Sequence, residues 1–216
     1  MEIKKKDFFW PSYVDLLTAL FAIVLVLFVL SFKLFKDREN ELIKEKNKFE
    51  VYAKEYERIQ KINIQVKALE HSGSFIYDSL YQRFLVKDFI GQEIFQSKSN
   101  IIKPEYYNSA VEAGKEIKKL IDELYKNEKI KFLVLIEGNT ANKYDGSIDK
   151  DNEYGYNLSY QRALALYRFW KSKGIIFDPN RTEIIIAGSG FSGVGRDKTE
   201  ENNKRFLIQI IPKLDK

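Results

Sequence analysis

The 216-residue sequence contains no cysteine and a single histidine, His71. Without cysteine, the chain can form no disulfide, no thiolate metal site and no cysteine nucleophile. One histidine cannot build a histidine-rich zinc site, and a Ser-His-Asp triad would depend on His71, which lies in a polar His-Ser-Gly-Ser turn. The sequence therefore predicts no metal site, no resident cofactor and no enzyme.

A dense cluster of basic residues is also missing, although the formal net charge is +5. Lysine and glutamate are interspersed along most of the chain, and no basic stripe with interleaved aromatic residues occurs. This distribution is typical of a solvated surface. We therefore expect no nucleic-acid partner.

Charge is nearly absent from residues 10–35, which read WPSYVDLLTALFAIVLVLFVLSFKLF and hold only Asp15 as a charge before residue 33. At a rise of about 1.5 Å per residue, a helix of this length exceeds the hydrocarbon core of a bilayer, which is about 30 Å thick. The run is long and SFKLFK is no small-residue cleavage site, so a cleaved signal peptide fits poorly. The stretch predicts one uncleaved transmembrane helix.

The flanks of this helix predict its orientation. Residues 1–9 carry three lysines, which favours a cytoplasmic N-terminus, and Trp10 and Tyr13 fit an aromatic belt at that interface. Basic residues between 33 and 38 weaken the charge asymmetry. We expect a single-pass protein of the bacterial inner membrane with a periplasmic C-terminal domain.

Helical spacing places the polar groups of this segment on one face together with small residues. The face consists of Asp15, Thr18, Ala19, Ala22 and Val26. Small residues let another helix approach closely, which suggests that the carboxylate faces a partner or a water-lined path. The alternative is an interfacial Asp15 that snorkels to the membrane edge, five residues after Trp10.

The motif WPSYVDLLTALFAIVLVLF resembles the transmembrane signature of flagellar stator B subunits (MotB) and their relatives in other ion-driven motors. The resemblance implies that Asp15 carries the translocated ion, a proton rather than sodium, with Thr18 beside it on the pore face. Tyr13, Ala19 and Ala22 would face the pore or the partner. That partner would be a multi-span A-type (MotA-like) subunit, a pentamer enclosing two copies of this chain.

Proline and glycine are absent between Asp37 and Leu69, which predicts a helical stalk over residues 36–71 that breaks at the turn His71–Ser74. Six of eight positions spaced by alternating steps of three and four are apolar or aromatic, in the series Leu42, Glu45, Phe49, Tyr52, Tyr56, Ile59, Asn63 and Val66. The pattern fits a short dimeric coiled coil, or a single helix that packs on its own domain. In the stator family such a stalk can also plug the ion path.

Residues 75–216 alternate predicted strands and helices. The expected elements are strand 84–90, helix 104–125, strand 130–137, helix 158–173, strand 182–187 and strand 205–211. KFLVLI and TEIIIA are apolar, β-branched-rich runs suited to a covered sheet. The expected fold class is α+β: a cytoplasmic N-terminus (1–9), a transmembrane helix (10–35), the stalk, and a domain with helices on one face of a small mixed sheet.

Four motifs resemble OmpA-like peptidoglycan-binding domains: EGNTA (137–141), NLSYQRALALYRFWKSKGI (157–175), IAGSG (186–190) and NNKRFLIQI (202–210). The resemblance implies a wall-binding site that includes Arg162, Asn157 and Asn139. A guanidinium suits this task because its planar fork binds a carboxylate bidentately. Arg162 could instead be a helix-capping or core-edge residue.

The sequence departs from that family pattern at two positions. Ala141 stands where the family has an aspartate for the amine of the peptide stem, and Asn139 stands where a histidine is usual. The loop 142–156 is acidic, and one of its carboxylates could supply the missing group, from Asp145, Asp149, Asp151 or Glu153. Otherwise the domain binds a different wall or none.

Together the modules predict the B subunit of a proton-driven motor. The alternative is a membrane-anchored, OmpA-like structural protein that binds the wall without conducting ions. Subunits of the first kind serve flagellar rotation, surface motility, envelope transport and Zorya-type antiphage defence. The altered wall motif favours a non-flagellar system.

Overall fold

The computed structural model describes residues 9–142 and 151–213. The chain divides into two compact units, Met1–Glu57 and Arg58–Lys216. The described part of the first unit is entirely helical, and the second unit holds a mixed sheet with helices.

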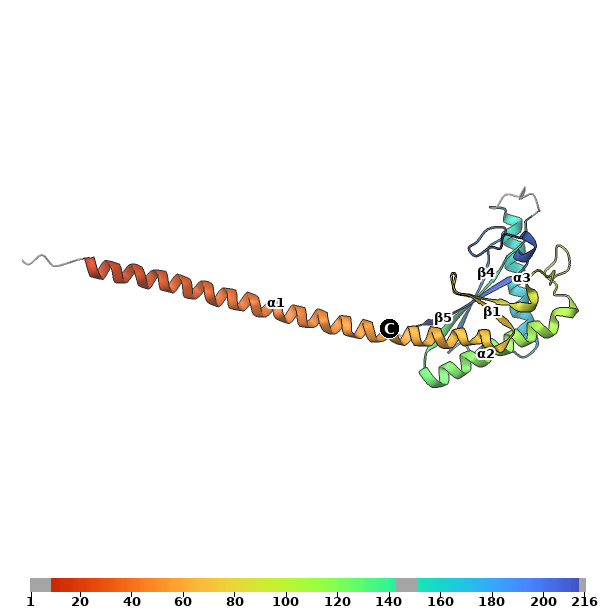
Figure 1. Ribbon diagram of the computed structural model, residues 1–216, viewed down its shortest axis with the longest axis horizontal. Coiled ribbons are helices and arrows are strands. Elements are labelled where there is room, and N and C mark those ends of the chain that lie inside the picture. Colours follow the sequence, from red (N-terminus) through yellow and green to blue (C-terminus); the bar gives the residue numbers. More distant parts are fainter. Residues whose placement is uncertain (1–8, 143–150, 214–216) are drawn as a thin grey trace, which may run out of the picture. The chain divides into compact units, whose positions relative to one another are not determined.

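A single helix, α1 (Phe9–Lys67), forms the described part of the first unit and continues into the second (Figure 1). Pro11 is compatible with it because a proline in the first turn removes no helical hydrogen bond. No proline or glycine follows until Gly73. The helix contains a stretch long and apolar enough, by length and composition, to cross a membrane. Side chains from Trp10 to Glu57 are all exposed in the described structure.

The end of α1 is part of the second unit. Its buried residues, with those of the 3₁₀ turn Ala68–Ser72 that follows, are Ile62, Val66 and Leu69. Lys61 forms an ion pair with Glu128 at 3.3 Å, and Arg58 donates a hydrogen bond to the Glu128 carbonyl. The turn ends at Gly73, whose φ of +89° favours glycine. The stalk thus packs on its own domain at this end, while the seam residues before Ile59 are exposed.

The sheet has five strands in the order β1-β2-β5-β3-β4. They are β1 (Phe75–Asp78), β2 (Arg83–Val86), β3 (Lys131–Gly138), β4 (Thr182–Gly188) and β5 (Phe206–Lys213). β3 and β4 are parallel, and the other neighbours are antiparallel. This confirms the α+β class with a mixed sheet. The sequence reading missed β1 and extended β2 to Ile90, whereas β2 ends before a 3₁₀ turn at Lys87–Phe89.

Two helices pack against one face of the sheet (Figure 1). They are α2 (Tyr107–Glu128), preceded by the 3₁₀ turn Pro104–Tyr106, and α3 (Glu153–Ser172). The indole N–H of Trp170 in α3 donates to the Ala110 carbonyl in α2 at 2.7 Å. α3 begins five residues earlier than predicted, because the Asn152 side chain caps it by accepting from the Gly155 amide at 3.2 Å.

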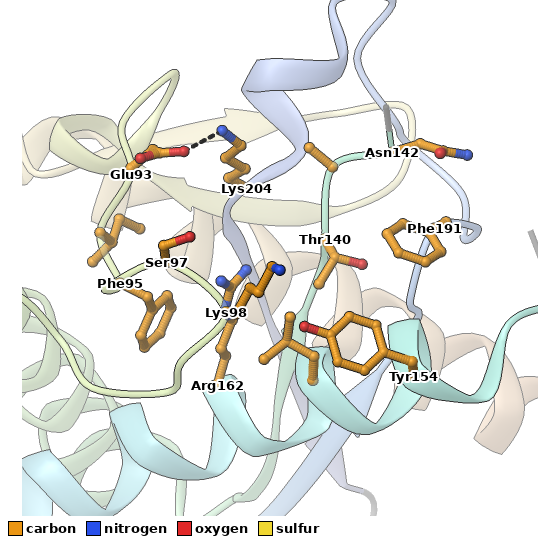
Figure 2. Close-up of a pocket in the computed structure, with 13 residues that line it drawn as sticks. Glu93, Phe95, Ser97, Lys98, Thr140, Asn142, Tyr154, Arg162, Phe191 and Lys204 are labelled. Carbon is orange, nitrogen blue, oxygen red and sulfur yellow. Dashed lines mark hydrogen bonds and ion pairs between the residues drawn. The ribbon is translucent and has the colours of Figure 1, made fainter. Parts of the chain in front are cut away.

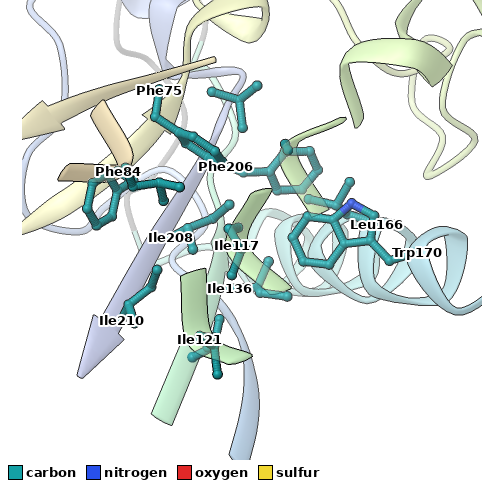
Figure 3. Close-up of a cluster of buried hydrophobic side chains, with 14 of the residues drawn as sticks. Phe75, Phe84, Ile117, Ile121, Ile136, Leu166, Trp170, Phe206, Ile208 and Ile210 are labelled. Carbon is teal, nitrogen blue, oxygen red and sulfur yellow. The ribbon is translucent and has the colours of Figure 1, made fainter. Parts of the chain in front are cut away.

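The core lies between this helical layer and the sheet (Figure 3). In β3 the residues Phe132, Val134 and Ile136 are fully buried, while the intervening Leu133 and Leu135 are half-buried on the other face. This alternation is expected when only one face of a strand is covered by helices.

Two paired glycines let α3 lie unusually close to the sheet. Gly138 and Gly188 are opposite each other at the ends of β3 and β4. A Cβ atom at Gly138 would lie 2.2 Å from the Ser159 carbonyl oxygen, and one at Gly188 would lie 2.3 Å from the Tyr160 amide nitrogen. Both contacts are with backbone, so neither can be relieved by rotating a side chain. The glycines therefore fix how closely the first turns of α3 approach the strand ends.

We expect Gly138→Ala to lower the free energy of unfolding of the domain by about 3 kcal/mol, because the new methyl group overpacks a backbone contact. Thermal unfolding followed by circular dichroism measures the loss. Gly174→Ala is the matched control: its site is open, so it reports only the cost of a φ of +75°, about 1 kcal/mol. Equal stability of the two variants would contradict the close-approach argument.

Candidate functional site

The first candidate site lies on α1 around Asp15. Its carboxylate, Thr18 and Ala22 share one helix face, and all are exposed in the described chain. The Thr18 hydroxyl donates to the Val14 carbonyl at 2.8 Å, so its oxygen remains available as an acceptor. The face therefore presents a carboxylate and a hydroxyl oxygen beside the small residue Ala19.

Tyr13 does not share this face. Two residues along a helix correspond to a rotation of about 200°, so Tyr13 lies almost opposite Asp15. Its ring instead makes an edge contact with Trp10, with ring centroids 6.4 Å apart. Tyr13 therefore lies on a different helix face from Asp15, and its contact with the pore or the partner stays a prediction.

The second candidate site is a cavity of about 260 Å³ in the C-terminal unit (Figure 2). Four chain segments line it: the loop before α2, the residues after β3, the start of α3, and the connection between β4 and β5. The side chains that define its chemistry are Glu93, Phe95, Lys98, Thr140, Ala141, Asn142, Tyr154, Arg162, Phe191 and Lys204. The cavity forms where the glycine contacts bring α3 against the ends of β3 and β4.

Arg162 has a structural role and a free end. Its Nε donates to the Ser99 carbonyl at 3.1 Å, and its guanidinium carbon lies 4.9 Å from the centre of the Phe95 ring. These contacts fix the loop before α2 to α3. Burial lowers the pKa of Arg162, and the nearby Tyr154 and Glu93 oppose this shift. Within the described chain its two terminal amino groups make no hydrogen bond, so they remain able to bind a carboxylate.

The other positions singled out for binding the cell wall differ in whether they line the cavity. Ala141 does line the cavity, as its position in the family pattern implies. Asn139 is 2% exposed, accepts a hydrogen bond from the Ser189 hydroxyl and does not line the cavity. Asn157 is exposed and is not part of the cavity lining. Of the three predicted wall-binding residues, the cavity therefore contains Arg162.

Ion pairs hold the rim of the cavity in place. Lys204 bonds to Glu93, and this hydrogen bond and charge lower the pKa of Glu93. Glu200 accepts the Asn142 amide at 2.9 Å and the Arg196 guanidinium at 2.6 Å. Burial would raise the pKa of Glu200, but these contacts outweigh it and hold the pKa below its ordinary value.

Four carboxylates of the loop 142–156 were predicted as candidates to replace the missing aspartate. Asp145 and Asp149 lie outside the described residues, while Asp151 and Glu153 are exposed. Neither Asp151 nor Glu153 lines the cavity. Among residues 9–142 and 151–213, no group of three or more His, Cys, Asp or Glu side chains is placed to hold a metal ion.

Sequence reasoning missed several cavity residues, including Phe95, Lys98, Tyr154 and Phe191. Lys204 lies in the motif NNKRFLIQI, which was recognised without assigning that lysine a role. Phe95 and Lys98 belong to a loop with no motif, so only the tertiary structure brings them to Arg162.

No protein-family model matches the sequence, and no curated protein matches it significantly. Solved structures do. A MotB periplasmic domain is 16% identical, with 65% of this chain and 69% of that one covered and a TM-score of 0.43. A putative MotB-like protein from Desulfovibrio vulgaris is 14% identical, with 71% and 91% covered and a TM-score of 0.42. The peptidoglycan-associated lipoprotein of Burkholderia pseudomallei is 17% identical, with 56% and 87% covered and a TM-score of 0.34.

We expect Glu200→Gln to destabilise the domain at pH 7 by about 1 kcal/mol, because charge-assisted hydrogen bonds become neutral ones. A carboxylate with a lowered native pKa stabilises the fold above its unfolded pKa, and this contribution is lost as the pH falls through the native pKa. The difference in melting temperature between wild type and variant should therefore shrink from pH 5 to pH 3. Glu123→Gln, at an exposed position of α2, is the control and should change little at any pH.

Proposed function

We propose that this chain is the B subunit of a proton-driven inner-membrane motor, with Asp15 carrying the ion and the C-terminal domain attached to the cell wall. The observation that carries the proposal is the placement of Asp15. It is the one carboxylate in an apolar helical stretch long enough to cross a membrane, and it shares a face with Thr18, Ala19 and Ala22.

The free energy needed to place a carboxylate in a membrane-spanning helix supports a functional role for Asp15. An ionised aspartate in the middle of a transmembrane helix costs about 2.5–3.5 kcal/mol on insertion scales, and less near the edge. A helix that serves only as an anchor gains nothing in return. A carboxyl group that takes up and releases a proton on the way across the membrane needs this position.

The proposal requires a partner, because an ion-conducting path past Asp15 must be enclosed by protein on its other sides. The small side chains of Ala19 and Ala22 allow a neighbouring helix to approach closely. We propose a multi-span A-type subunit, arranged as a pentamer around two copies of this chain. Exposed apolar and aromatic residues on the stalk seam, including Leu42, Phe49, Tyr52 and Tyr56, are suited to pairing of the two copies.

The C-terminal cavity supports attachment to peptidoglycan. Arg162 offers two unpaired amino groups at a site with apolar walls, and such a site fits the carboxylate of a peptide stem. We propose that the N-terminus is cytoplasmic and this domain periplasmic, where the wall lies. A wall-bound anchor would let the motor transmit torque.

A structural protein that binds the wall without conducting ions is the second candidate. The observation in its favour is that the cavity and α1 would serve a tether equally well without Asp15. The two candidates differ in what happens when the carboxylate alone is removed.

We expect Asp15→Asn to abolish ion-driven activity while leaving membrane insertion and assembly unchanged, because the amide keeps the size of the side chain but cannot exchange a proton. The measurement is proton flux into vesicles that contain this chain with its A-type subunit, with sodium in place of a proton gradient as a second arm. Asp37→Asn, a matched change later in α1, should retain flux. Undiminished proton flux in the Asp15 variant would contradict the proposal of an ion-driven motor subunit and favour the structural protein that binds the cell wall without conducting ions.

We expect Arg162→Lys to weaken binding of the full chain in detergent to isolated peptidoglycan by about tenfold, because the charge remains but the bidentate fork is lost. Co-sedimentation with wall sacculi measures the change. Arg168→Lys is the control, since Arg168 is exposed on the same helix and does not line the cavity. Equal effects of the two substitutions would show that Arg162 only anchors the loop before α2.

A further inference from the structure

Lys98 occupies a backbone conformation that lysine rarely adopts. It lies in a tight turn in which the Ser99 amide donates to the Gln96 carbonyl at 3.1 Å, and its φ is +54°. The third residue of such a turn is usually glycine or asparagine, because a Cβ atom is strained at positive φ. Most other positive-φ positions in the described chain are glycine. A residue other than glycine at such a position stores backbone strain, and strained residues cluster at ligand-binding sites in proteins.

The turn is held rigidly around Lys98. Phe95 and Ile102 form an isolated β-bridge across its base, and the Gln96 amide donates to the Ile101 carbonyl at 3.0 Å. On the other side the Ser99 carbonyl accepts from Arg162 at 3.1 Å. The same arginine that faces the cavity therefore also fixes the turn that carries Lys98.

Two cations face the cavity without a carboxylate partner in the described chain. The Lys98 and Arg162 side chains reach into the same space, with Phe95 on one side and Tyr154 on the other (Figure 2). A third cation, Lys204, is already paired with Glu93 at the rim. Among the described residues that line the cavity, the charge without an ion-pair partner is therefore positive and lies on two groups from different chain segments.

We infer that Lys98 is a ligand-binding residue and that, with Arg162, it makes the cavity a two-cation site for a peptide bearing two free carboxylates. This inference rests on the proposed wall binding of the domain. A planar guanidinium binds one carboxylate through two hydrogen bonds, and an ammonium group binds the second as a point charge. Phe95, Tyr154 and Phe191 supply an apolar lining for the peptide between them. A free amine on the ligand is not needed for this mode of binding.

The test is calorimetric titration of the full chain in detergent with the tripeptide L-Ala-γ-D-Glu-meso-diaminopimelate. Three modified forms are compared: one acetylated on the free amine of diaminopimelate, one amidated at the D-Glu α-carboxylate, and one amidated at the L-centre carboxylate of diaminopimelate. Because the tripeptide has three free carboxylates, any two that bind include at least one of the two amidated positions. We expect acetylation to change the Kd by less than about twofold and at least one amidation to raise it about tenfold.

The decisive variant is Lys98→Gly, because glycine relieves the backbone strain while removing the cation. It should raise the Kd for the unmodified tripeptide about tenfold without lowering the melting temperature, and amidation of the carboxylate that Lys98 binds should then cost nothing further. Lys129→Gly is the matched control: Lys129 has a φ of +53° at the C-terminal end of α2 and does not line the cavity. It should relieve the same strain and leave the Kd unchanged.

Each other outcome overturns a different statement. Unchanged binding by Lys98→Gly, or loss of binding on acetylation of the amine, overturns the two-carboxylate site while wall binding stands. If the wild-type chain binds none of the four peptides, both the two-carboxylate site and the attachment to peptidoglycan through this cavity are wrong. The role proposed for Asp15 is decided separately by proton flux.

Discussion

The contact between the start of α3 and the ends of β3 and β4 positions the C-terminal site. Gly138 and Gly188 leave room for the backbone of Ser159 and Tyr160, and the Ser159 hydroxyl in turn accepts the Gly190 amide at 2.9 Å. This arrangement brings one turn of α3 against the residues that follow both strands. Arg162 lies one turn further along the same helix, so the contact also determines which loops it can reach.

From this contact outward, the cavity is assembled by arginines that bridge chain segments. Arg162 joins α3 to the loop before α2, and Arg196 joins the β4–β5 connection to the residues after β3 by donating to the Thr140 carbonyl at 3.2 Å. Arg83 forms a buried ion pair with Glu137 at 2.6 Å on the other face of the sheet. The contacts of Arg162 and Arg196 tie together segments that are far apart in the chain, so the loops around the cavity are more constrained than their lack of secondary structure suggests.

The two units of the chain depend on different surroundings. The second unit has a continuous core, and the last turns of α1 belong to it through Ile62 and Val66. The first unit has no core of its own in the described structure: from Trp10 to Glu57 every side chain is exposed. Lipid, a partner subunit and a second copy of the chain are the environments that suit its apolar and small-residue faces.

The apolar helix with Asp15, the helical stalk with its end near Gly73, and the order of the main strands and helices are predictable from the amino-acid sequence. The reason is that periodicity, length and the positions of proline and glycine act locally. The sequence also singled out Arg162. Three further features are visible only in the folded chain: Phe95 and Lys98 join Arg162 in one cavity, Asn139 and Asn157 lie outside it, and the end of the stalk packs on its own domain. These features depend on contacts between segments far apart in the chain, such as the contact between Ser99 and Arg162, which are separated by 63 positions, and no local pattern records such contacts.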